Sequence, residues 1–245
     1  MLRLVTGCSR ISPSIVVARS ILNTGLRWSS SGATLVYPPS PSAQHSDLAT
    51  FLSYSKRTGL DEKSTVYVGT HYEYTVADTL TKYGFSLQRV GGASDYGIDL
   101  LGTWAVPPPD QAGGANGHGE DTIRMIIQCK AGGSQRSGPQ HIRELEGAFA
   151  GAPPGWRTSA PGAGRVMALL VAERAATKGV QDALGRSKWP MGYVFCEGNG
   201  SVRQILWNAR ATELGLEGVE IGTRHVGGEK ELVIMRQGRR VAFKS

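Results

Sequence analysis

A strand-like stretch that closes on polar side chains constrains this sequence more than any other feature. Residues 122–130 read TIRMIIQCK, and every second position from Ile123 to Cys129 is apolar, the period of two that predicts a strand with one face in a core. Gln128 and Lys130 then share the opposite face at the end of the strand. An amide and an ammonium are rare at the end of a buried strand. The residues expected around Gln128 and Lys130 therefore decide whether their role is structural or functional.

The surrounding sequence alternates between helical and strand patterns. Apolar residues at helical spacing, followed by Gly84, predict a helix over residues 70–83. Further helices are expected at 139–149 and 177–186, and strands at 85–90, 98–106, 122–130, 165–171 and 191–196. This order predicts an α/β fold with a mixed central sheet flanked by helices. Residues 201–207 are expected to pair back onto the last of these strands, and residues 231–245 to form a final hairpin.

The domain organisation follows from composition. A chain of 245 residues with 40% hydrophobic content suits one domain with appendages. Residues 1–28 contain four arginines and no acidic residue, which is typical of a mitochondrial transit peptide and predicts import into the matrix. Residues 29–65 are then a linker and N-terminal extension, 66–197 the main domain, and 198–245 a β-rich C-terminal extension. No apolar run in the sequence is long enough to cross a membrane.

Charge and cysteine content argue against several function classes. The formal net charge of +7 falls to +3 without the four presequence arginines, too little to predict a nucleic-acid binder from bulk charge. The three cysteines have no regular spacing and the five histidines form no HxxxH pair, which argues against a zinc site and a disulfide framework. The glycine-rich stretches lack the ending of a phosphate-binding P-loop. A local site must therefore carry the function.

Asp99 lies within the apolar stretch YGIDLLG, on the preceding strand. A carboxylate there costs free energy unless a metal ion or a lysine compensates it. Ile98 and Leu100 are expected to lie on the opposite face, so that Asp99 shares a face with Gln128 and Lys130. This set suits metal-assisted phosphodiester hydrolysis, because carboxylate and amide oxygens are ligands for Mg²⁺. The lysine can orient the attacking water and stabilise developing negative charge.

Each of these residues also has a structural interpretation. Asp99 can shape a strand-end turn, and Lys130 can be a solvated strand end. Asp95 is interpreted as a turn residue in GASDYG. Glu73 ends the stretch THYE, which fits a capping box in which its carboxylate accepts from the Thr70 amide. A place near a metal ion is the alternative for this glutamate.

The C-terminal stretch carries Arg236, Arg239 and Arg240, which are candidates for nucleic-acid phosphate contacts on a hairpin. Charged residues on hairpins also keep a protein soluble and protect sheet edges from pairing. The sequence leaves both roles open.

Three stretches together resemble known families. They read EYTVADTLTKYGFSLQRVGGASDYGIDLLG, IIQCKA and IRELEGAFAG. They are similar to the Mrr-like branch of the restriction endonuclease superfamily, whose PD-(D/E)xK motif appears as D...QxK. They are closer still to the fungal mitochondrial family called required for respiratory growth protein 7. The resemblance covers residues 66–197 and implies a restriction-endonuclease-like αβββαβ core, a nuclease ancestry dependent on Mg²⁺ or Mn²⁺, and a mitochondrial role linked to respiratory growth.

The resemblance also assigns roles to individual residues. Asp99 matches the metal-binding aspartate, Gln128 the variant of the second acidic position, and Lys130 the catalytic lysine. Glu73 falls where such enzymes keep a first-helix acid near the metal, so that Asp99, Glu73 and Gln128 are the expected metal ligands. A long insertion between Asp99 and Gln128 departs from the family pattern and is placed in a hairpin loop.

Three functions follow from these features. The first is a mitochondrial metal-dependent nuclease-like protein acting on mitochondrial DNA, with RNA as the alternative substrate. The second is a catalytically degenerate member that binds nucleic acid without cutting it, which the glutamine at position 128 favours. The third is an assembly factor of the matrix that keeps the fold without the nucleic-acid function.

Overall fold

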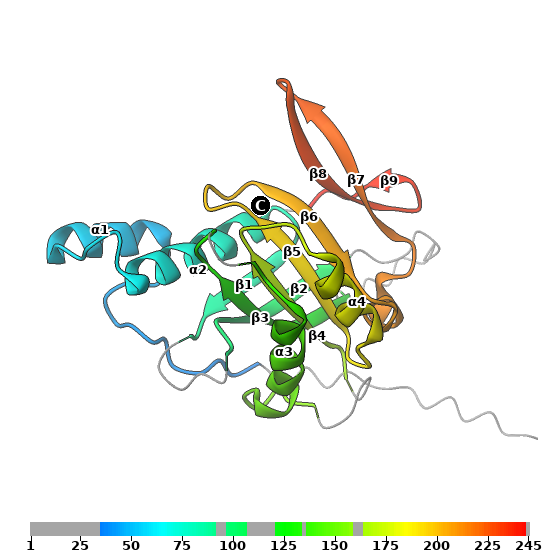
Figure 1. Cartoon of the computed structure of the whole chain (residues 1–245), viewed down its shortest axis with the longest axis horizontal. Coiled ribbons are helices and arrows are strands. Elements are labelled where there is room, and N and C mark those ends of the chain that lie inside the picture. Colours follow the sequence, from blue (N-terminus) through cyan, green and yellow to red (C-terminus); the bar gives the residue numbers. More distant parts are fainter. Residues whose placement is uncertain (1–34, 92–96, 107–120, 134–135, 159–163, 244–245) are drawn as a thin grey trace, which may run out of the picture. The chain divides into compact units, whose positions relative to one another are not determined.

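The computed structural model describes residues 35–91, 97–106, 121–133, 136–158 and 164–243 (Figure 1). The predicted transit peptide and Asp95 lie outside these ranges.

A six-stranded mixed sheet with the spatial order β1-β2-β3-β4-β5-β6 forms the centre of the fold. The first three strands are antiparallel neighbours, β3, β4 and β5 are parallel, and β6 returns antiparallel to β5. The strands are β1 (Phe85–Arg89), β2 (Leu100–Val106), β3 (Asp121–Lys130), β4 (Val166–Ala172), β5 (Met191–Cys196) and β6 (Val202–Trp207). All seven residues of β4 are buried, as expected of a central parallel strand covered on both faces.

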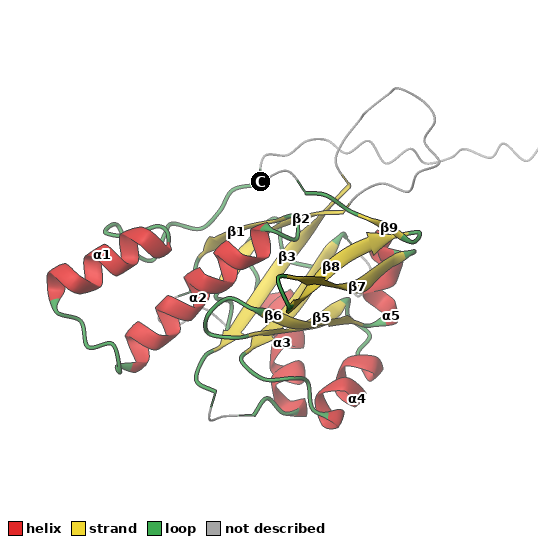
Figure 2. Ribbon diagram, turned by 90° about the horizontal axis from the view of Figure 1, so that it is seen from above, coloured by secondary structure: helices red, strands yellow, loops and turns green. Residues whose placement is uncertain are grey.

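Helices cover both faces of this sheet (Figures 1 and 2). On one face, α2 (Thr65–Thr81) packs its buried side chains into a core that includes Leu100 and Met125. On the other face, α3 (Pro139–Gly151) and α4 (Lys178–Arg186) pack around Ile126 and Leu170. The prediction of a mixed sheet flanked by helices is therefore confirmed.

The strand directions gather several chain segments at one end of the sheet. Because β1 is antiparallel to β2 and β2 to β3, β1 runs in the same direction as β3, β4 and β5. The carboxyl ends of these four strands therefore share one end of the sheet with the beginnings of β2 and β6. We call this end the carboxyl edge.

The first core helix begins earlier than its sequence pattern predicts. Ser64 is the N-cap of α2, and its hydroxyl accepts a hydrogen bond from the Tyr67 amide at 3.2 Å. Thr70 lies inside the helix, where its amide is already part of the helical ladder. The predicted capping box between Thr70 and Glu73 is therefore wrong, because a serine six residues upstream starts the helix.

The N-terminal extension contains a helix that the sequence analysis did not predict. Helix α1 (Leu48–Thr58) is capped by Asp47, whose carboxylate accepts from the Thr50 amide at 2.8 Å, and it buries Phe51. Upstream of it, the Tyr37 ring lies 4.8 Å from the Trp156 ring. Part of the segment interpreted as a linker is thus packed on the main domain.

A second, three-stranded sheet follows β6. After the short α5 (Ala209–Ala211) and the π-helical turn η1 (Thr212–Leu216), the chain forms β7 (Val219–Val226), β8 (Glu229–Arg236) and β9 (Arg239–Arg240). The return of β6 onto β5 and the final hairpin are both confirmed, whereas β7 was not predicted. Leu232 and Ile234 join the core on the α2 face. Among the described residues, no helix meets the length and apolarity needed to span a membrane.

Candidate functional site

Asp99 lies just before β2, where three strands meet. Its amide donates to the Ile127 carbonyl, and its carbonyl accepts from the Val90 and Gly91 amides, each at 2.9 Å. Its carboxylate Oδ2 accepts from the Cys129 amide at 2.6 Å. The backbone and the side chain of Asp99 are therefore held by β3 and by the end of β1, which fixes a carboxylate at the carboxyl edge.

The expectation that Ile98 and Leu100 share the face opposite Asp99 is wrong. Ile98 packs into the core on the α3 side of the sheet, whereas Leu100 packs on the α2 side. The physical reason is that regular β2 begins only at Leu100, so the alternation of side chains does not extend back through Asp99.

Gln128 is a buried polar residue with an unused acceptor. The residue is 7% exposed, and its Oε1 atom is buried without a hydrogen-bond partner among the described residues. A Cβ atom at Gly97 would come within 2.8 Å of the Gln128 Nε2 atom, and Gly97 has a φ of 74°. Glycine therefore suits position 97 for two reasons, and the orphaned Gln128 Oε1 is a candidate ligand atom.

Lys130 is the half-buried last residue of β3, in register with Ala172 of β4. The Cys129 amide that holds the Asp99 carboxylate lies between Gln128 and Lys130 in the chain. The structure therefore brings Asp99, Gln128 and Lys130 together at the carboxyl edge.

Glu73 projects from α2 toward the end of β1, where it forms an ion pair with Arg89. Both side chains are 13% exposed. The arginine also donates to the Thr70 hydroxyl at 3.4 Å and lies over the Tyr74 ring, 5.6 Å from its centroid. The predicted first-helix acid is thus present at the carboxyl edge, with a guanidinium beside it that the sequence analysis did not single out.

The pKa of the Cys129 thiol depends on the charges at the carboxyl edge. Burial raises its pKa well above the usual value, and the negative charges of Asp99 and Glu73 raise it further. The thiol is therefore neutral at physiological pH, which agrees with the prediction that Cys129 belongs to the core rather than to the chemistry. The Cys129 thiol is therefore within electrostatic range of both the Asp99 and the Glu73 carboxylates.

Two further residues at the carboxyl edge escaped the sequence analysis. Glu173 follows β4 directly, and its Oε1 accepts from the Gly132 amide at 3.3 Å. The next residue, Arg174, donates from Nε to the Gly133 carbonyl. Their position just after a fully apolar strand was the available signal, because residues that follow parallel strands gather at one end of a sheet.

The predicted nucleic-acid arginines lie away from this edge. Arg236 donates to the carbonyls of Gly215 and Glu217 at 3.4 and 3.3 Å, and the same turn accepts from Arg165 at the start of β4. The length of β4 therefore separates Arg236 from the carboxyl edge, about 20 Å at the usual rise per residue.

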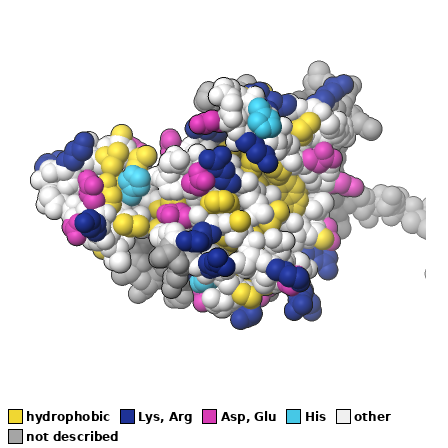
Figure 3. All heavy atoms as spheres, turned by 45° about the horizontal axis from the view of Figure 1, so that its top comes forward, with side chains coloured by type: hydrophobic (Ala, Val, Ile, Leu, Met, Phe, Trp, Pro, Cys, Tyr) yellow, Lys and Arg dark blue, Asp and Glu magenta, His cyan; other side chains and the backbone are white. Residues whose placement is uncertain are grey.

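The other two predicted arginines, Arg239 and Arg240, form β9 beside Arg236 and are exposed. On the face shown in Figure 3, basic side chains are interspersed with acidic ones and do not form one continuous basic patch.

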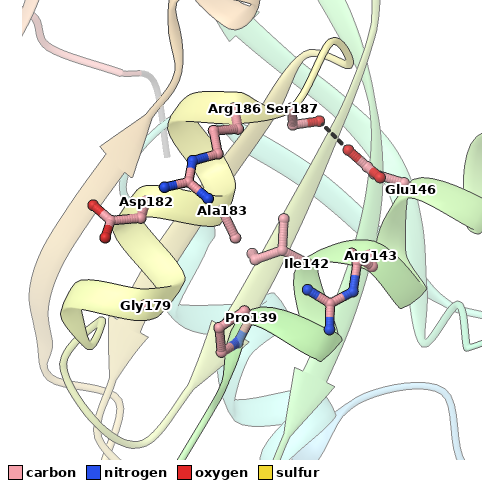
Figure 4. A pocket seen from close by; sticks show the side chains of 9 residues that line it. All are labelled: Pro139, Ile142, Arg143, Glu146, Gly179, Asp182, Ala183, Arg186 and Ser187. Carbon is pink, nitrogen blue, oxygen red and sulfur yellow. Dashed lines mark hydrogen bonds between the residues drawn. The ribbon is translucent and has the colours of Figure 1, made fainter.

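A groove of about 390 Å³ lies between α3 and α4 (Figure 4). Arg143 and Arg186 line it together with Glu146 and Asp182, and the Ser187 hydroxyl donates to Glu146 at 2.5 Å. None of the predicted site residues lines this groove.

Comparison with protein families shows to which family this chain belongs. The model of the family described as required for respiratory growth protein 7 matches residues 64–223, which include α2, the whole six-stranded sheet and part of β7. The chain belongs to this family. The predicted resemblance to the required for respiratory growth protein 7 family is confirmed, and the match extends further toward the C-terminus than residue 197.

Individual members of the required for respiratory growth protein 7 family are similar to parts of the chain. The mitochondrial protein of that name from Zygosaccharomyces rouxii is 27% identical over 164 residues, 55% of this chain and 66% of its own length. Its counterpart in Saccharomyces cerevisiae strain S288c is 29% identical over 128 residues, 40% of this chain and 53% of its own length.

An uncharacterized mitochondrial protein of Schizosaccharomyces pombe is 31% identical over 112 residues, 46% of this chain and 41% of its own length. The chain thus spans about half the length of the curated relatives it matches. These three relatives are all named as mitochondrial proteins. No solved structure matches the chain.

The residues of this family member at the carboxyl edge fit a magnesium ion. Asp99 offers a carboxylate held by the Cys129 amide, and the orphaned Oε1 of the preceding residue, Gln128, offers a second hard oxygen. Mg²⁺ is commonly held by one or two protein oxygens with water completing its shell. Among the described residues, no three or more histidine, cysteine or acidic side chains form a group that could hold a metal ion.

Proposed function

We propose that the protein is a metal-dependent nuclease-like protein of the mitochondrial matrix that acts on DNA and is required for respiratory growth. The mitochondrial and respiratory parts follow from the names of its family and relatives. The nuclease part rests on one observation. A positioned carboxylate, a buried oxygen without a partner and a lysine meet at the carboxyl edge.

The topology supports the same proposal. A helix, three antiparallel strands, a crossover helix and a parallel strand follow one another from α2 to β4, which is the αβββαβ order of a restriction-endonuclease-like core. Val106 and Asp121, between which the insertion falls, are paired with each other at the end of the sheet opposite the carboxyl edge.

Each residue then has a defined task. Asp99 and Gln128 would hold Mg²⁺ or Mn²⁺ through Oδ1 or Oδ2 and Oε1. When held there, the ion would supply Lewis acidity, which would polarise a phosphoryl oxygen and lower the pKa of an attacking water. Lys130 donates hydrogen bonds to the phosphate and stabilises the negative charge that develops on it. Burial of Gln128 strengthens these interactions, because water is excluded from one side of the site.

One observation favours a second candidate function. Arg89 neutralises Glu73, the acid expected beside the metal, and Gln128 stands where a second carboxylate is usual. A site with fewer negatively charged ligands binds divalent ions more weakly than a site with three carboxylates. A catalytically degenerate protein that binds nucleic acid, or assembles other matrix components, is therefore the alternative.

Cleavage assays separate the two proposals. The full-length protein is incubated with supercoiled, linear, branched DNA and single-stranded RNA in the presence of Mg²⁺ or Mn²⁺, beside Asp99→Ala and Lys130→Ala. Lys188→Ala is the matched control, because this exposed lysine lies beyond α4 and away from the carboxyl edge. We expect both site variants to lose at least about 100-fold in cleavage rate, the contribution typical of one catalytic group. Cleavage that survives in both variants would refute this active site, and salt-sensitive binding without cleavage by the unaltered protein would establish the degenerate binder.

A further inference from the structure

Two loops at the carboxyl edge are joined to each other. One follows β3 and leads to α3, and the other follows β4 and leads to α4. Glu173 accepts from the Gly132 amide at 3.3 Å, and Arg174 donates to the Gly133 carbonyl. Two side chains of the second loop, Glu173 and Arg174, are thus hydrogen-bonded to the backbone of the first loop within three residues of Lys130.

The same loops are joined a second time near the helix starts. The Thr177 hydroxyl donates to the Ser137 carbonyl at 3.5 Å, and the Tyr193 hydroxyl donates to the Arg174 carbonyl at 2.7 Å. Tyr193 and Ser137 are buried. The backbone is therefore held by a hydrogen bond at the residue that follows Arg136 and at Arg174 itself.

The basic residues of the carboxyl edge fall into two groups. Arg89, Lys178 and Arg203 are paired, in the ion pairs Arg89–Glu73, Lys178–Asp182 and Arg203–Glu197. Three others follow the central strands at this edge: Lys130 ends β3, Arg136 lies just before α3, and Arg174 follows β4. These three form no ion pair with a carboxylate in the described part of the chain, and both arginines are exposed.

Exposed guanidinium groups without a carboxylate partner suit phosphate. Arginine presents several N–H donors in a planar fork that matches phosphate oxygens, and it stays charged at every physiological pH. In Arg174 the Nε–H is used by the Gly133 carbonyl, which fixes the side chain and leaves its two terminal nitrogens for a ligand. A strand of nucleic acid carries a phosphate at each nucleotide, so neighbouring phosphates can meet neighbouring arginines.

We propose that Arg136 and Arg174 form a phosphate clamp, which grips the nucleic-acid backbone beside the phosphodiester that Lys130 contacts. This inference rests on the proposed function and specifies its binding surface. It replaces the hairpin arginines Arg239 and Arg240 as the main contact, because the hairpin base lies at the opposite end of β4. The clamp recognises the phosphate backbone, a chemistry that DNA and RNA share.

Binding assays on the full-length protein test the clamp. Fluorescently labelled duplex DNA and single-stranded RNA are titrated in EDTA, so that binding is measured apart from cleavage, at salt concentrations from about 50 to 200 mM. The test variant is Arg136→Gln/Arg174→Gln. Arg239→Gln/Arg240→Gln is the matched control, because it removes the same charge from exposed residues. Thermal melting of each variant shows whether the loops remain folded.

The clamp predicts a specific pattern. The test variant should bind at least about 10-fold more weakly, and the slope of log Kd against log salt should fall by about 2, one for each lost phosphate contact. The control should stay within about twofold of the unaltered protein. Arg136→Lys/Arg174→Lys keeps both charges and should restore the salt slope, which a purely structural role of Arg174 would not predict.

Contrary results distinguish failure of the phosphate clamp from failure of nucleic-acid binding itself. If the unaltered protein binds nucleic acid and only the hairpin variant weakens binding, the clamp is refuted and nucleic-acid binding stands. A lysine variant whose salt slope stays as low as that of the glutamine variant also refutes it. If the unaltered protein binds neither polymer at the lowest salt, both the clamp and the nucleic-acid function fail. The polymer on which the test variant loses affinity identifies DNA or RNA as the source of the phosphates.

Discussion

At the scale of single residues, backbone geometry decides where the candidate site can form. The Cys129 amide holds the Asp99 carboxylate, and the bare Cα of Gly97 leaves room for the Gln128 amide. The alternation of β3 alone predicted that Gln128 and Lys130 share a face. The role of Gly97 was not predictable, because a positive φ and a contact with residue 128 exist only in the folded chain.

Gly97→Ala should therefore destabilise the protein more than an ordinary glycine substitution. The new Cβ meets the Gln128 Nε2 at 2.8 Å and also strains a backbone with φ of 74°, and we expect a loss of about 2 to 3 kcal/mol in the free energy of unfolding. Gly132→Ala is the matched control, since φ is 89° there and a Cβ would meet nothing within 4 Å. Its loss should be about 1 kcal/mol. Urea denaturation measures both, and equal losses would show that the contact with Gln128 is unimportant.

At the scale of elements, an ion pair joins the first core helix to the first strand. Glu73 of α2 and Arg89 of β1 are both largely buried, and the arginine also contacts Thr70 and Tyr74. A buried charge that loses its partner is costly, whereas removal of both charges costs less. The sequence placed Glu73 near the site but gave no indication of this partner, which lies 16 residues away on another element.

A double-mutant cycle on Glu73→Gln and Arg89→Gln measures the strength of this connection. Each single substitution should lower the free energy of unfolding by about 2 to 4 kcal/mol, because it leaves one charge uncompensated. The double variant should lose about 1 to 3 kcal/mol less than the two singles together. Chemical denaturation of the four proteins supplies the values. Strict additivity would mean that the two side chains do not stabilise each other in solution.

At the scale of the whole molecule, buried thiol and phenol groups link stability to alkaline pH. Burial, with smaller contributions from nearby carboxylates, raises the pKa of Cys196 to about 12, and burial raises that of Tyr83 to about 12. Burial also raises the pKa of Tyr72, whose hydroxyl donates to the Cys196 carbonyl at 2.8 Å. All three groups stay neutral in the folded protein at a pH where they ionise in the unfolded chain.

The free energy of unfolding should therefore fall as the pH rises above about 9. The unfolded state loses protons there while the folded state keeps them, so ionisation favours unfolding. Cys196 alone should account for about 2 kcal/mol by about pH 10.5, from the difference between its ordinary pKa of 9.0 and about 12. Urea denaturation at several pH values tests this. Cys196→Ala should show a shallower decline, and an unchanged decline would assign the effect to the tyrosines.

The sequence by itself determined the order of the core elements, because apolar periodicity and glycine positions reflect local geometry. Strand β5 was predicted at its exact bounds, and the helices α3 and α4 within two residues. It also determined the grouping of Asp99, Gln128 and Lys130, since adjacent antiparallel strands bring their ends together. Helix α1 escaped because its hydrophobic face is narrow, with Phe51 as its main buried side chain.

Only the tertiary structure decided which charges meet. Strand direction placed Glu173 and Arg174 beside Lys130, paired Arg89 with Glu73, and put Arg236 at the far end of β4. These relations depend on contacts between elements far apart in the chain, and no local pattern encodes them. The carboxyl edge exists because β1, β3, β4 and β5 end where β2 and β6 begin, which is a property of the sheet and not of any one segment.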